Sequence, residues 1–423
     1  MLTKKREKSK KYPNSFIVLV FATFIDRLGG FLLFPFFSIY VLLHFGVTEI
    51  EVGILFSIFA SGSIIGSLVG GALTDKYGRK TMAIFGLVSS GIGSILMGIV
   101  NELYLFFIIA AVLGVLGDLG GPARQAMVVD LLSEDRRADG FGLLRVAVNL
   151  AAVIGPILGG FLYKYSFLLL FILDAVSSLI TALIVFVVIP ETKPERQTDK
   201  PEESFIITLK GYIEVIKDYI YIIFLVISAL TVLVYMQMNS MLSVFLLNEY
   251  AFPPEWFGLL LSMNALMVVI LQFMITRWTA KYAPMKMMVL GTFLYMIGFS
   301  MYGFVTEWYL FFVAMAILTV GEMIDIPVSQ AVVARFAPED KRGRYMAVFG
   351  FHWSIPTLFG VYGASLVYKN LGANWVWYIA GILCFIAMIG FWILHSVTKE
   401  RLRKTNENSI EDVSLEVSEE ITE

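Results

Sequence analysis

Two charged residues, Asp26 and Arg27, lie in the middle of a long apolar run, where residues 24–35 read FIDRLGGFLLFP. If this run crosses a membrane, both charges lie near the bilayer centre, where an ionisable side chain is costly and points to function. Three further carboxylates, Asp118, Glu322 and Asp325, lie at similar depth in later apolar runs. Buried carboxylates can exchange a proton for a cation, because desolvation and neighbouring negative charge favour the protonated form.

The composition indicates a membrane protein. The chain has 423 residues, 58% of them hydrophobic and 16% charged, with a mean hydropathy of +0.79. Soluble proteins carry roughly 45–50% apolar and about 25% charged residues. The net charge of -2, without a pooled basic segment, gives no reason to expect a nucleic-acid partner. The single cysteine, Cys384, excludes an intramolecular disulfide and a zinc cluster of several thiolates, and we expect it in the core.

The apolar runs set the number of spans, since a transmembrane helix needs about 20 apolar residues. Only helices and closed barrels satisfy the backbone in hydrocarbon, and the alternation typical of barrel strands is absent. The sequence therefore predicts an all-α membrane protein. We expect twelve transmembrane helices, at 14–44, 51–73, 81–100, 103–131, 141–164, 167–189, 219–247, 257–278, 286–305, 308–336, 345–368 and 374–397.

The distribution of Lys and Arg predicts the orientation, because cytoplasmic loops carry an excess of them. With both termini inside, the inner segments hold 27 of the 32 Lys and Arg residues, and the outer loops hold two, Lys164 and Lys369. The basic N-terminus precedes an apolar run too long for a cleaved signal peptide, so we expect the first span to be retained. This predicts a multi-pass protein of the cell membrane with both termini in the cytoplasm.

An internal repeat organises the chain. Residues 122–141 align without gaps to residues 327–346, an offset of 205 residues, and VGILFS at 52–57 aligns to FGLLLS at 257–262 at the same offset. Each repeat holds six spans, so both halves share one orientation, as in secondary transporters that alternate access to a midplane site. We expect two parallel six-helix bundles with a central cavity. The predicted parts are a basic N-terminus (1–13), the two bundles (14–189 and 219–398), a cytoplasmic linker (190–218) and an acidic tail (399–423).

The loop between spans two and three reads GALTDKYGRKT at 71–81. It resembles the signature of the major facilitator superfamily at that place, and the match includes Gly71, Asp75, Gly78 and Arg79. The resemblance covers nearly the whole chain and implies the twelve-helix fold of that family. It also implies that Asp75 and Arg79, together with Asp130 at the end of span four, act in gating. The alternative is a topology signal with ordinary surface ion pairs, each worth roughly 0–1 kcal/mol.

A second stretch, GPILGG at 155–160, resembles the motif of the family's drug-exporting antiporters. Its residues are Gly155, Pro156, Gly159 and Gly160. Small residues let helices approach closely and proline permits a bend, so helix packing explains the stretch as well as antiport does. With this motif, the chain resembles a multidrug-efflux-type, drug/proton antiporter-like member of the superfamily.

The resemblance further implies that spans one, four, seven and ten line the cavity. Our hypothesis assigns proton coupling to Asp26 and Asp118, with Arg27 facing Asp118 across the cavity, and assigns cationic or amphipathic substrates to Glu322 and Asp325. The alternative is a static buried network that fixes helix register. Arg124 and Arg145 are expected nearer the inner face, and Asp174 and His352 are expected in structural roles. The remaining polar cavity candidates are Asn149, Tyr235, Gln237, Asn239 and Asn264.

These features predict a secondary transporter and not an enzyme, because no phosphate-binding loop and no metal or nucleophile cluster is present in the sequence. We expect no cofactor and no metal. The partners are a small-molecule substrate, protons and the lipid bilayer, and the chain is expected to act as a monomer. The leading hypothesis is proton-coupled efflux of cationic or amphipathic molecules by alternating access. The alternative is a proton-coupled importer or a lipid or metabolite carrier on the same fold.

Overall fold

The computed structural model describes residues 12–133, 136–193, 214–338 and 342–422. Over these residues the chain is helical and contains no β-strand. Eleven helices within them are long and apolar enough to cross a membrane. The predicted span at 345–368 coincides with α17 (Phe351–Leu371), which is not among the eleven because polar residues such as His352 and Ser354 lower its hydropathy. The predicted all-α membrane fold is confirmed.

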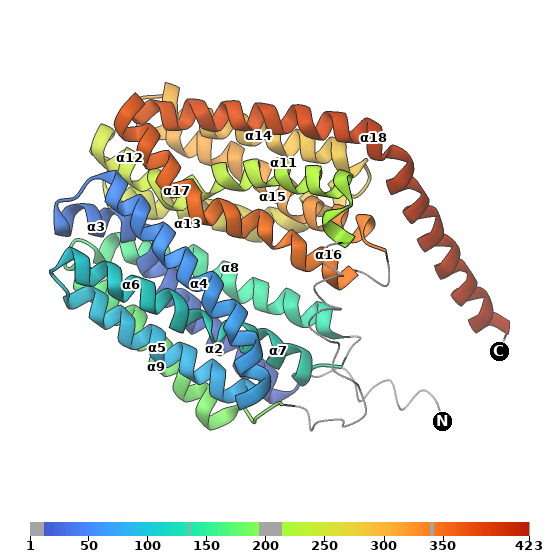
Figure 1. Cartoon of the computed structure of the whole chain (residues 1–423), viewed down its shortest axis with the longest axis horizontal. Coiled ribbons are helices and arrows are strands. Elements are labelled where there is room, and N and C mark those ends of the chain that lie inside the picture. The colour runs from blue at the N-terminus through green and yellow to red at the C-terminus, as the bar shows by residue number, and fades with distance from the viewer. Residues whose placement is uncertain (1–11, 134–135, 194–213, 339–341, 423) are drawn as a thin grey trace. The chain divides into compact units, whose positions relative to one another are not determined.

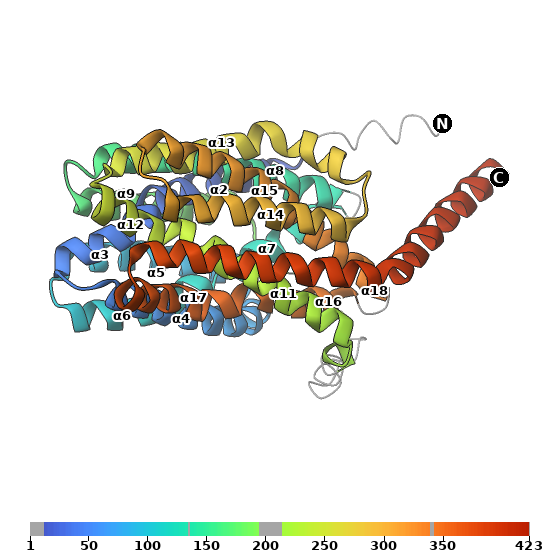
Figure 2. The ribbon, with the colours of Figure 1, turned by 90° about the horizontal axis from the view of Figure 1, so that it is seen from above.

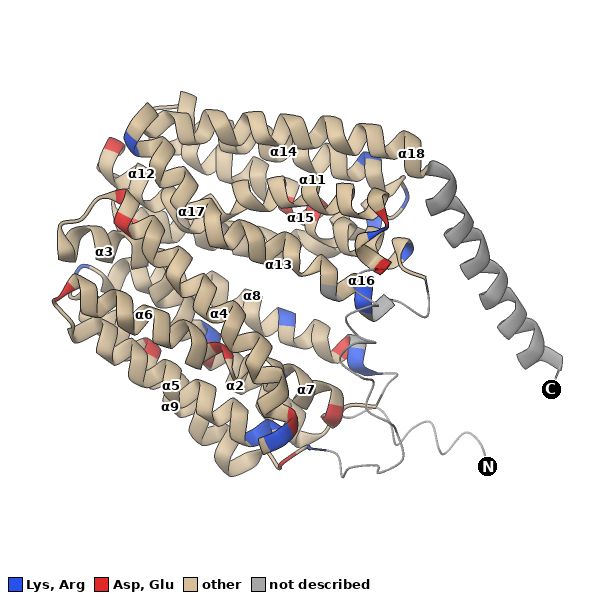
Figure 3. Ribbon diagram, viewed as in Figure 1, with Lys and Arg blue, Asp and Glu red and all other residues tan. Residues whose placement is uncertain are grey.

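Large apolar side chains cover the outside of the helices, as expected where lipid is the solvent. Leu68, Leu183 and Phe273 are 75%, 61% and 73% exposed. Lys, Arg, Asp and Glu gather mostly near the helix ends, with few inside the helices (Figure 3). The few charged residues inside the helices are therefore the exceptions that need an explanation.

The chain divides into two compact units. The first comprises Met1–Thr198, Gln237–Val269 and Val361–Asn370, and the second comprises Asp199–Met236, Ile270–Gly360 and Leu371–Glu423. The predicted division into bundles at 14–189 and 219–398 stays a prediction.

The first unit holds the helices of the first six predicted spans (Figure 1). Among them, α2 packs on α8 and α9, α4 packs on α6, and α5 packs on α9. The helices are α2 (Asn14–Leu33), α3 (Phe37–Phe45), α4 (Glu49–Tyr77), α5 (Arg79–Ile99), α6 (Leu103–Asp118), α7 (Gly121–Leu131), α8 (Arg137–Leu162) and α9 (Phe167–Val188). The unit also contains α12 (Met241–Tyr250) and the first part of α13 (Pro254–Thr279).

The first and fourth predicted spans are interrupted. In the first, the short 3-10 helix η2 (Phe34–Phe36) contains Pro35 and separates α2 from α3. In the fourth, α6 ends at Asp118 and α7 begins at Gly121, with Pro122 in its first turn. Proline suits a first turn, because its missing N–H would have no intrahelical partner there. The interruption in the fourth span places Asp118 at the end of α6 rather than inside a continuous helix.

The second unit holds α11 (Tyr219–Tyr235), α14 (Pro284–Phe304), α15 (Trp308–Phe336), α16 (Arg342–Phe349) and α18 (Ala373–Thr422). The 3-10 helix η4 (Met236–Asn239) follows α11. Helices α14 and α18 lie side by side, as Figures 1 and 2 both show. Helix α18 continues through the acidic tail to Thr422. Cys384 on α18 is fully buried, as predicted.

Candidate functional site

A cavity of about 320 Å³ lies within the first unit. Charged side chains and aromatic rings share its wall, which is contributed by α2, η2, α3, α4, α5, α6, α7 and α9. The charged residues that line it are Asp26, Arg27, Asp118, Arg124 and Asp174, and the aromatic ones are Phe34, Phe37, Phe56, Phe59 and Phe171. Three of the five residues assigned to proton coupling or substrate, Asp26, Arg27 and Asp118, thus face one cavity.

Glycines let the helices around this cavity approach at the backbone. A Cβ added at Gly86 on α5 would lie 2.9 Å from the Cα atom of Gly120, in the turn between α6 and α7. A Cβ at Gly29 on α2 would lie 3.0 Å from the Cα atom of Asp174 on α9. A Cβ at Gly29 would also lie 2.9 Å from Cβ of Ser177, and real Cβ atoms essentially never pack below 3.0 Å, so both close approaches favour glycine. The contacts hold Asp118 and Asp174 at fixed positions in the cavity wall.

Asp26 forms an ion pair inside the cavity. The Nη1 atom of Arg124 lies 3.3 Å from Oδ2 of Asp26, and the side chains are 25% and 15% exposed. The hydroxyl of Ser178 donates a hydrogen bond of 3.2 Å to the other carboxylate oxygen, Oδ1. The sequence analysis expected Arg124 nearer the inner face, whereas the structure pairs it with Asp26 in the cavity wall.

Asp118 accepts a hydrogen bond from the hydroxyl of Ser63 on α4. The positive charges of Arg124 and Arg27 both act on its carboxylate. The direct contact expected between Arg27 and Asp118 is wrong, because these two described side chains form no ion pair. Arg27 lines the cavity without a carboxylate in direct contact, and Arg124 takes the central position.

Asp174 is a third carboxylate of the same wall, and the sequence had assigned it a structural role. Its Oδ2 atom accepts a hydrogen bond of 2.8 Å from the hydroxyl of Ser94 on α5. No Lys or Arg of the described chain forms an ion pair with it. The cavity therefore contains one more acidic group than was predicted, and this group has no direct counter-ion.

A smaller cavity of about 20 Å³ lies within the second unit, beside the other predicted carboxylates. Its wall includes Tyr235, Asp325 and His352. Asp325 is 6% exposed, and its Oδ1 atom has no hydrogen-bond partner among the described residues. The hydroxyl of Tyr235 donates a 3.1 Å hydrogen bond to Oε1 of Glu322. The ring of His352 contacts the carbonyl oxygen of Phe349 and stacks on the Phe349 ring, which agrees with the packing role expected for it.

The remaining polar candidates do not line either of these two cavities. Gln237 and Asn264 are buried, at 3% and 8% exposure, and Asn149 is half-buried on α8. Asn239 ends η4. Arg145 is exposed on α8. The assignment of these Asn and Gln residues to a substrate site stays a prediction.

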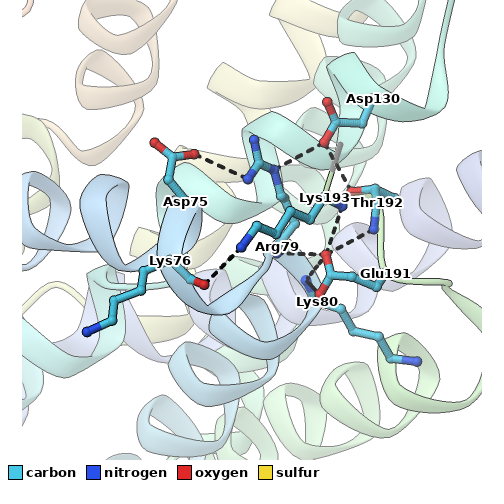
Figure 4. Close-up of polar contacts among 8 residues, drawn as sticks. All are labelled: Asp75, Lys76, Arg79, Lys80, Asp130, Glu191, Thr192 and Lys193. Carbon is cyan, nitrogen blue, oxygen red and sulfur yellow. Dashed lines mark hydrogen bonds and ion pairs between the residues drawn. The ribbon is translucent and has the colours of Figure 1, made fainter. Parts of the chain in front are cut away.

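The predicted gating residues meet at the turn between α4 and α5 (Figure 4). Arg79 lies 3.2 Å from Asp75 through Nη1 and 3.3 Å from Asp130 through Nε. Gly78 has a φ of +100°, a conformation that L-residues rarely adopt, and so the turn requires glycine. Gly71 has open space where a side chain would be. We call Asp75, Arg79, Asp130 and Glu191 the turn cluster.

Glu191 completes the turn cluster, and the sequence did not identify it. It follows the end of α9 and accepts hydrogen bonds from the backbone N–H groups of Arg79 at 2.8 Å and Lys80 at 3.2 Å, capping the N-terminus of α5. It also accepts from the N–H groups of Thr192 and Lys193, each at 3.0 Å. Partial burial raises the pKa of Glu191, but these four N–H donors together outweigh burial and leave its pKa below the usual value.

The GPILGG stretch on α8 packs closely on its neighbours. A Cβ at Gly155 would lie 2.6 Å from Cβ of Phe31, and one at Gly160 would lie 2.7 Å from the Cα atom of Glu255. Gly159 faces the carbonyl oxygen of Leu32, and the carbonyl of Pro156 faces Gly258 of α13. Two residues past the end of α8, Lys164 lies 2.6 Å from Glu255. These contacts give each small residue a packing role.

Two signals could have found the missed residues. Asp174 is the single charged residue of the apolar run 167–189, so the criterion that selected Asp26 selects it too. The GGP sequence at 120–122 indicates a helix interruption, which would have moved Arg124 relative to a straight helix. Glu191 acts through backbone N–H groups, and no residue pattern in the sequence marks such a contact.

Comparison with known proteins places these features in context. A family model described as Major Facilitator Superfamily matches residues 19–257 and 225–419. A Na⁺, Li⁺, K⁺/H⁺ antiporter of Planococcus maritimus is 28% identical over 422 residues, which cover 93% of this chain and 98% of that protein. Multidrug resistance protein MdtH of Escherichia coli is 26% identical over 386 residues, covering 89% and 93%.

Solved structures share the fold at low sequence identity. The nucleoside transporter NupG superposes with a TM-score of 0.78 at 13% identity and covers 90% of this chain and 100% of its own. The peptide transporter POT superposes with a TM-score of 0.75 at 18% identity, covering 92% and 95%. At such identities the likeness shows the fold alone.

Proposed function

Because this chain belongs to the Major Facilitator Superfamily, we propose that it is a proton-coupled antiporter that exports cations across the cell membrane. The family and the relatives are membrane transporters, so the chain is a secondary transporter and not an enzyme. The proposal concerns the substrate, a cation, and the coupling ion, a proton. We also propose that it acts as a monomer with both termini in the cytoplasm.

One observation carries the proposal: three carboxylates and two arginines face a single cavity within the first unit. Ionised carboxylates attract cations, and in a low-dielectric wall they can be neutralised either by a cation or by a proton. A site that binds either a proton or a cation, but not both at once, exchanges the proton for the cation. The five rings of the wall add favourable contacts, because a cation is attracted to the face of an aromatic ring.

The cavity volume limits the size of the substrate. About 320 Å³ is at the small end of the roughly 300–1,000 Å³ typical of ligand pockets. It suits a partly hydrated alkali cation or a single organic monocation. The similarity to an alkali-cation/proton antiporter supports the first class, and the similarity to a multidrug resistance protein supports the second.

Within this function, Asp26 and Asp118 are the carboxylates that a cation reaches. Arg124 is paired with Asp26, so an arriving cation competes with an arginine that is already in contact. Displacement of Arg124 would couple substrate binding to the position of α7, which begins three residues before it. In one state Arg124 would neutralise Asp26, and in the other the substrate cation would do so. The substrate would then bind the two states with different affinity, as a ligand-driven conformational change requires.

The turn cluster would serve as the gate. Asp130 lies at the end of α7, the helix that carries Arg124, and it accepts from Arg79 and from the hydroxyl of Thr192. A shift of α7 would therefore alter both contacts. In the second unit, we propose that Glu322 and Asp325 favour cationic substrates, with Tyr235 positioning Glu322.

The test uses inverted membrane vesicles with an imposed acid interior, in which a pH-sensitive dye reports proton loss. Addition of Na⁺, Li⁺ or K⁺, or of ethidium or tetraphenylphosphonium, should release protons from vesicles with wild-type protein. Asp26→Asn and Asp118→Asn should abolish the release at equal protein level. Glu102→Gln is the matched control, because it removes an exposed carboxylate at the start of α6, outside the cavity, and should leave the release unchanged.

The outcomes separate the candidates. Release with alkali ions alone assigns inorganic cations, and release with the organic ions alone assigns drug-like substrates. No release with any cation contradicts cation export. Substrate-driven proton uptake in right-side-out vesicles would then favour the alternative, a proton-coupled importer or metabolite carrier.

A further inference from the structure

Asp174 has a place in the cavity that the coupling scheme above does not use. It lies seven residues into α9, about 10 Å along the helix from Phe167. It lines the cavity with Asp26 and Asp118, although it belongs to a different helix from either. A carboxylate at this depth requires either compensation or a proton.

The three carboxylates differ in their compensation. Asp26 has an arginine at 3.3 Å and a serine hydroxyl at 3.2 Å. Asp118 has the hydroxyl of Ser63 and the charges of two arginines. Asp174 has one hydroxyl, from Ser94, and that hydroxyl also lies 3.2 Å from the carbonyl oxygen of Phe171. A single hydroxyl proton cannot serve both acceptors fully, so Asp174 is the least compensated of the three.

The packing around Asp174 explains why no counter-ion reaches it. On α2, Gly29 places the backbone against the Cα atom of Asp174 and the side chain of Ser177. On α5, Gly91 faces the carbonyl oxygen of Ala175, where a Cβ would lie 3.1 Å away. Both helices thus present small residues to this part of α9, and neither supplies a basic side chain to it.

The charge balance of the cavity indicates one bound proton. The titratable groups that line it are Asp26 and Arg27 from α2, Asp118 from α6, Arg124 from α7 and Asp174 from α9. If all five are charged, three negative charges face two positive ones. One proton makes the cavity neutral, and the cost of a buried charge is lowest when the proton resides on the carboxylate without a counter-ion.

We propose that Asp174 is the proton-carrying residue of this transporter. The inference rests on the proposed function and adds to it the group that holds the exchanged proton. When a cation binds beside Asp26 and Asp118, the O–H bond of the Asp174 carboxylic acid breaks and the proton passes to water in the cavity. The cation then replaces the proton as the balancing positive charge. Asp26 and Asp118 bind the cation, and Asp174 holds the proton that leaves when the cation binds.

The first test locates the proton without any transport. Infrared difference spectra of purified protein, recorded between neutral and alkaline pH, show the C=O stretch of a protonated carboxyl group apart from the amide bands. Every protein in the series carries Asp325→Asn, because Asp325 is a second buried carboxylate. In that background the band should be present with Asp174 intact and absent in Asp174→Asn. Asp174→Glu should keep the band at a shifted position. In the same background, a band that persists in Asp174→Asn, or that Asp174→Glu leaves unshifted, overturns the proposal.

The second test measures the linkage between proton and cation. In detergent, binding of ethidium or Na⁺ to wild type should release protons and weaken as the pH falls. Asp174→Asn should still bind the cation but with an affinity independent of pH, and its proton release should fall by roughly tenfold or more, as expected when a reciprocal coupling is removed. Retained cation binding shows that the variant is folded. Proton release equal to that of wild type would overturn the exchange step.

The two tests keep this inference separate from the proposed function. Absence of cation-evoked proton release in wild type overturns cation/proton exchange and the step assigned to Asp174 in it. The infrared band then still decides whether Asp174 holds a proton.

Discussion

The ion pair between Asp26 and Arg124 supports a quantitative prediction about the cavity. Asp26→Asn and Arg124→Gln each remove one charge of the pair, and the double variant removes both. Each single variant should destabilise the protein, because it leaves the other charge in the cavity wall without its partner. The double variant should lose less than the sum of the two single losses, because it leaves neither charge without its partner.

The magnitude follows from the geometry. At the observed 3.3 Å and an effective dielectric constant of about 20, the Coulomb attraction is about 5 kcal/mol before desolvation. Desolvation offsets much of this, although the side chains remain 15% and 25% exposed. We expect each single variant to lose about 3 kcal/mol and the pair to show a coupling energy of about 2 kcal/mol.

Equilibrium unfolding in mixed detergent micelles provides the free energies for the double-mutant cycle. Arg27→Gln, on the same wall but without a direct carboxylate contact, is the matched control and should show a coupling to Asp26 below about 0.5 kcal/mol. Additive losses for Asp26→Asn and Arg124→Gln would refute the assignment of Arg124 as the partner of Asp26. A larger coupling for Arg27 than for Arg124 would instead assign Arg27 as the partner of Asp26.

Three further predictions concern packing and capping. Glu191→Gln should cost about 1 kcal/mol by weakening the cap of α5. Because the folded pKa of Glu191 is lowered, its stabilisation is complete above the unfolded pKa of about 4.3 and is lost as the pH falls through the folded pKa. The free energies of unfolding of wild type and Glu191→Gln should therefore converge in acid. A difference that stays constant with pH would contradict the cap. Gly78→Ala should cost about 1–3 kcal/mol through its φ of +100°, measured in the same unfolding assay, and a neutral result would mean that the turn relaxes. Gly160→Ala should cost about 1–3 kcal/mol of stability, because its Cβ would meet the backbone of Glu255. Gly142→Ala on the same helix, with open space around it, should be neutral or stabilising. Equal effects of the two substitutions would refute the packing role of the GPILGG stretch.

Much of the fold could be predicted from hydropathy, because lipid imposes one requirement on every span. The helices follow the predicted apolar runs, and Asp26 and Asp118 both line one cavity as the depth argument implied. Depth along a helix is a local property that the sequence records directly. The family resemblance grouped Asp75, Arg79 and Asp130, and Arg79 contacts both carboxylates in the structure.

Pairing across helices could not be predicted in the same way. Which arginine meets Asp26 depends on how α2 and α7 pack against each other, and the structure pairs Asp26 with Arg124 of α7. Asp174 entered the cavity because Gly29 lets α2 and α9 touch at the backbone, a contact between residues far apart in sequence. Such contacts depend on how helix surfaces fit, and hydropathy does not encode that fit.

The buried cysteine has a practical consequence for spectroscopy. Cys384 is the one thiol of the chain and is fully buried on α18. A buried thiol in apolar surroundings reacts slowly with labelling reagents, because the thiolate is the reactive form. Cysteines introduced at exposed positions could therefore carry spin labels or fluorophores in the otherwise native protein. Distance changes between such probes on addition of a cation or a proton would then report the transport cycle directly, without prior removal of a native residue.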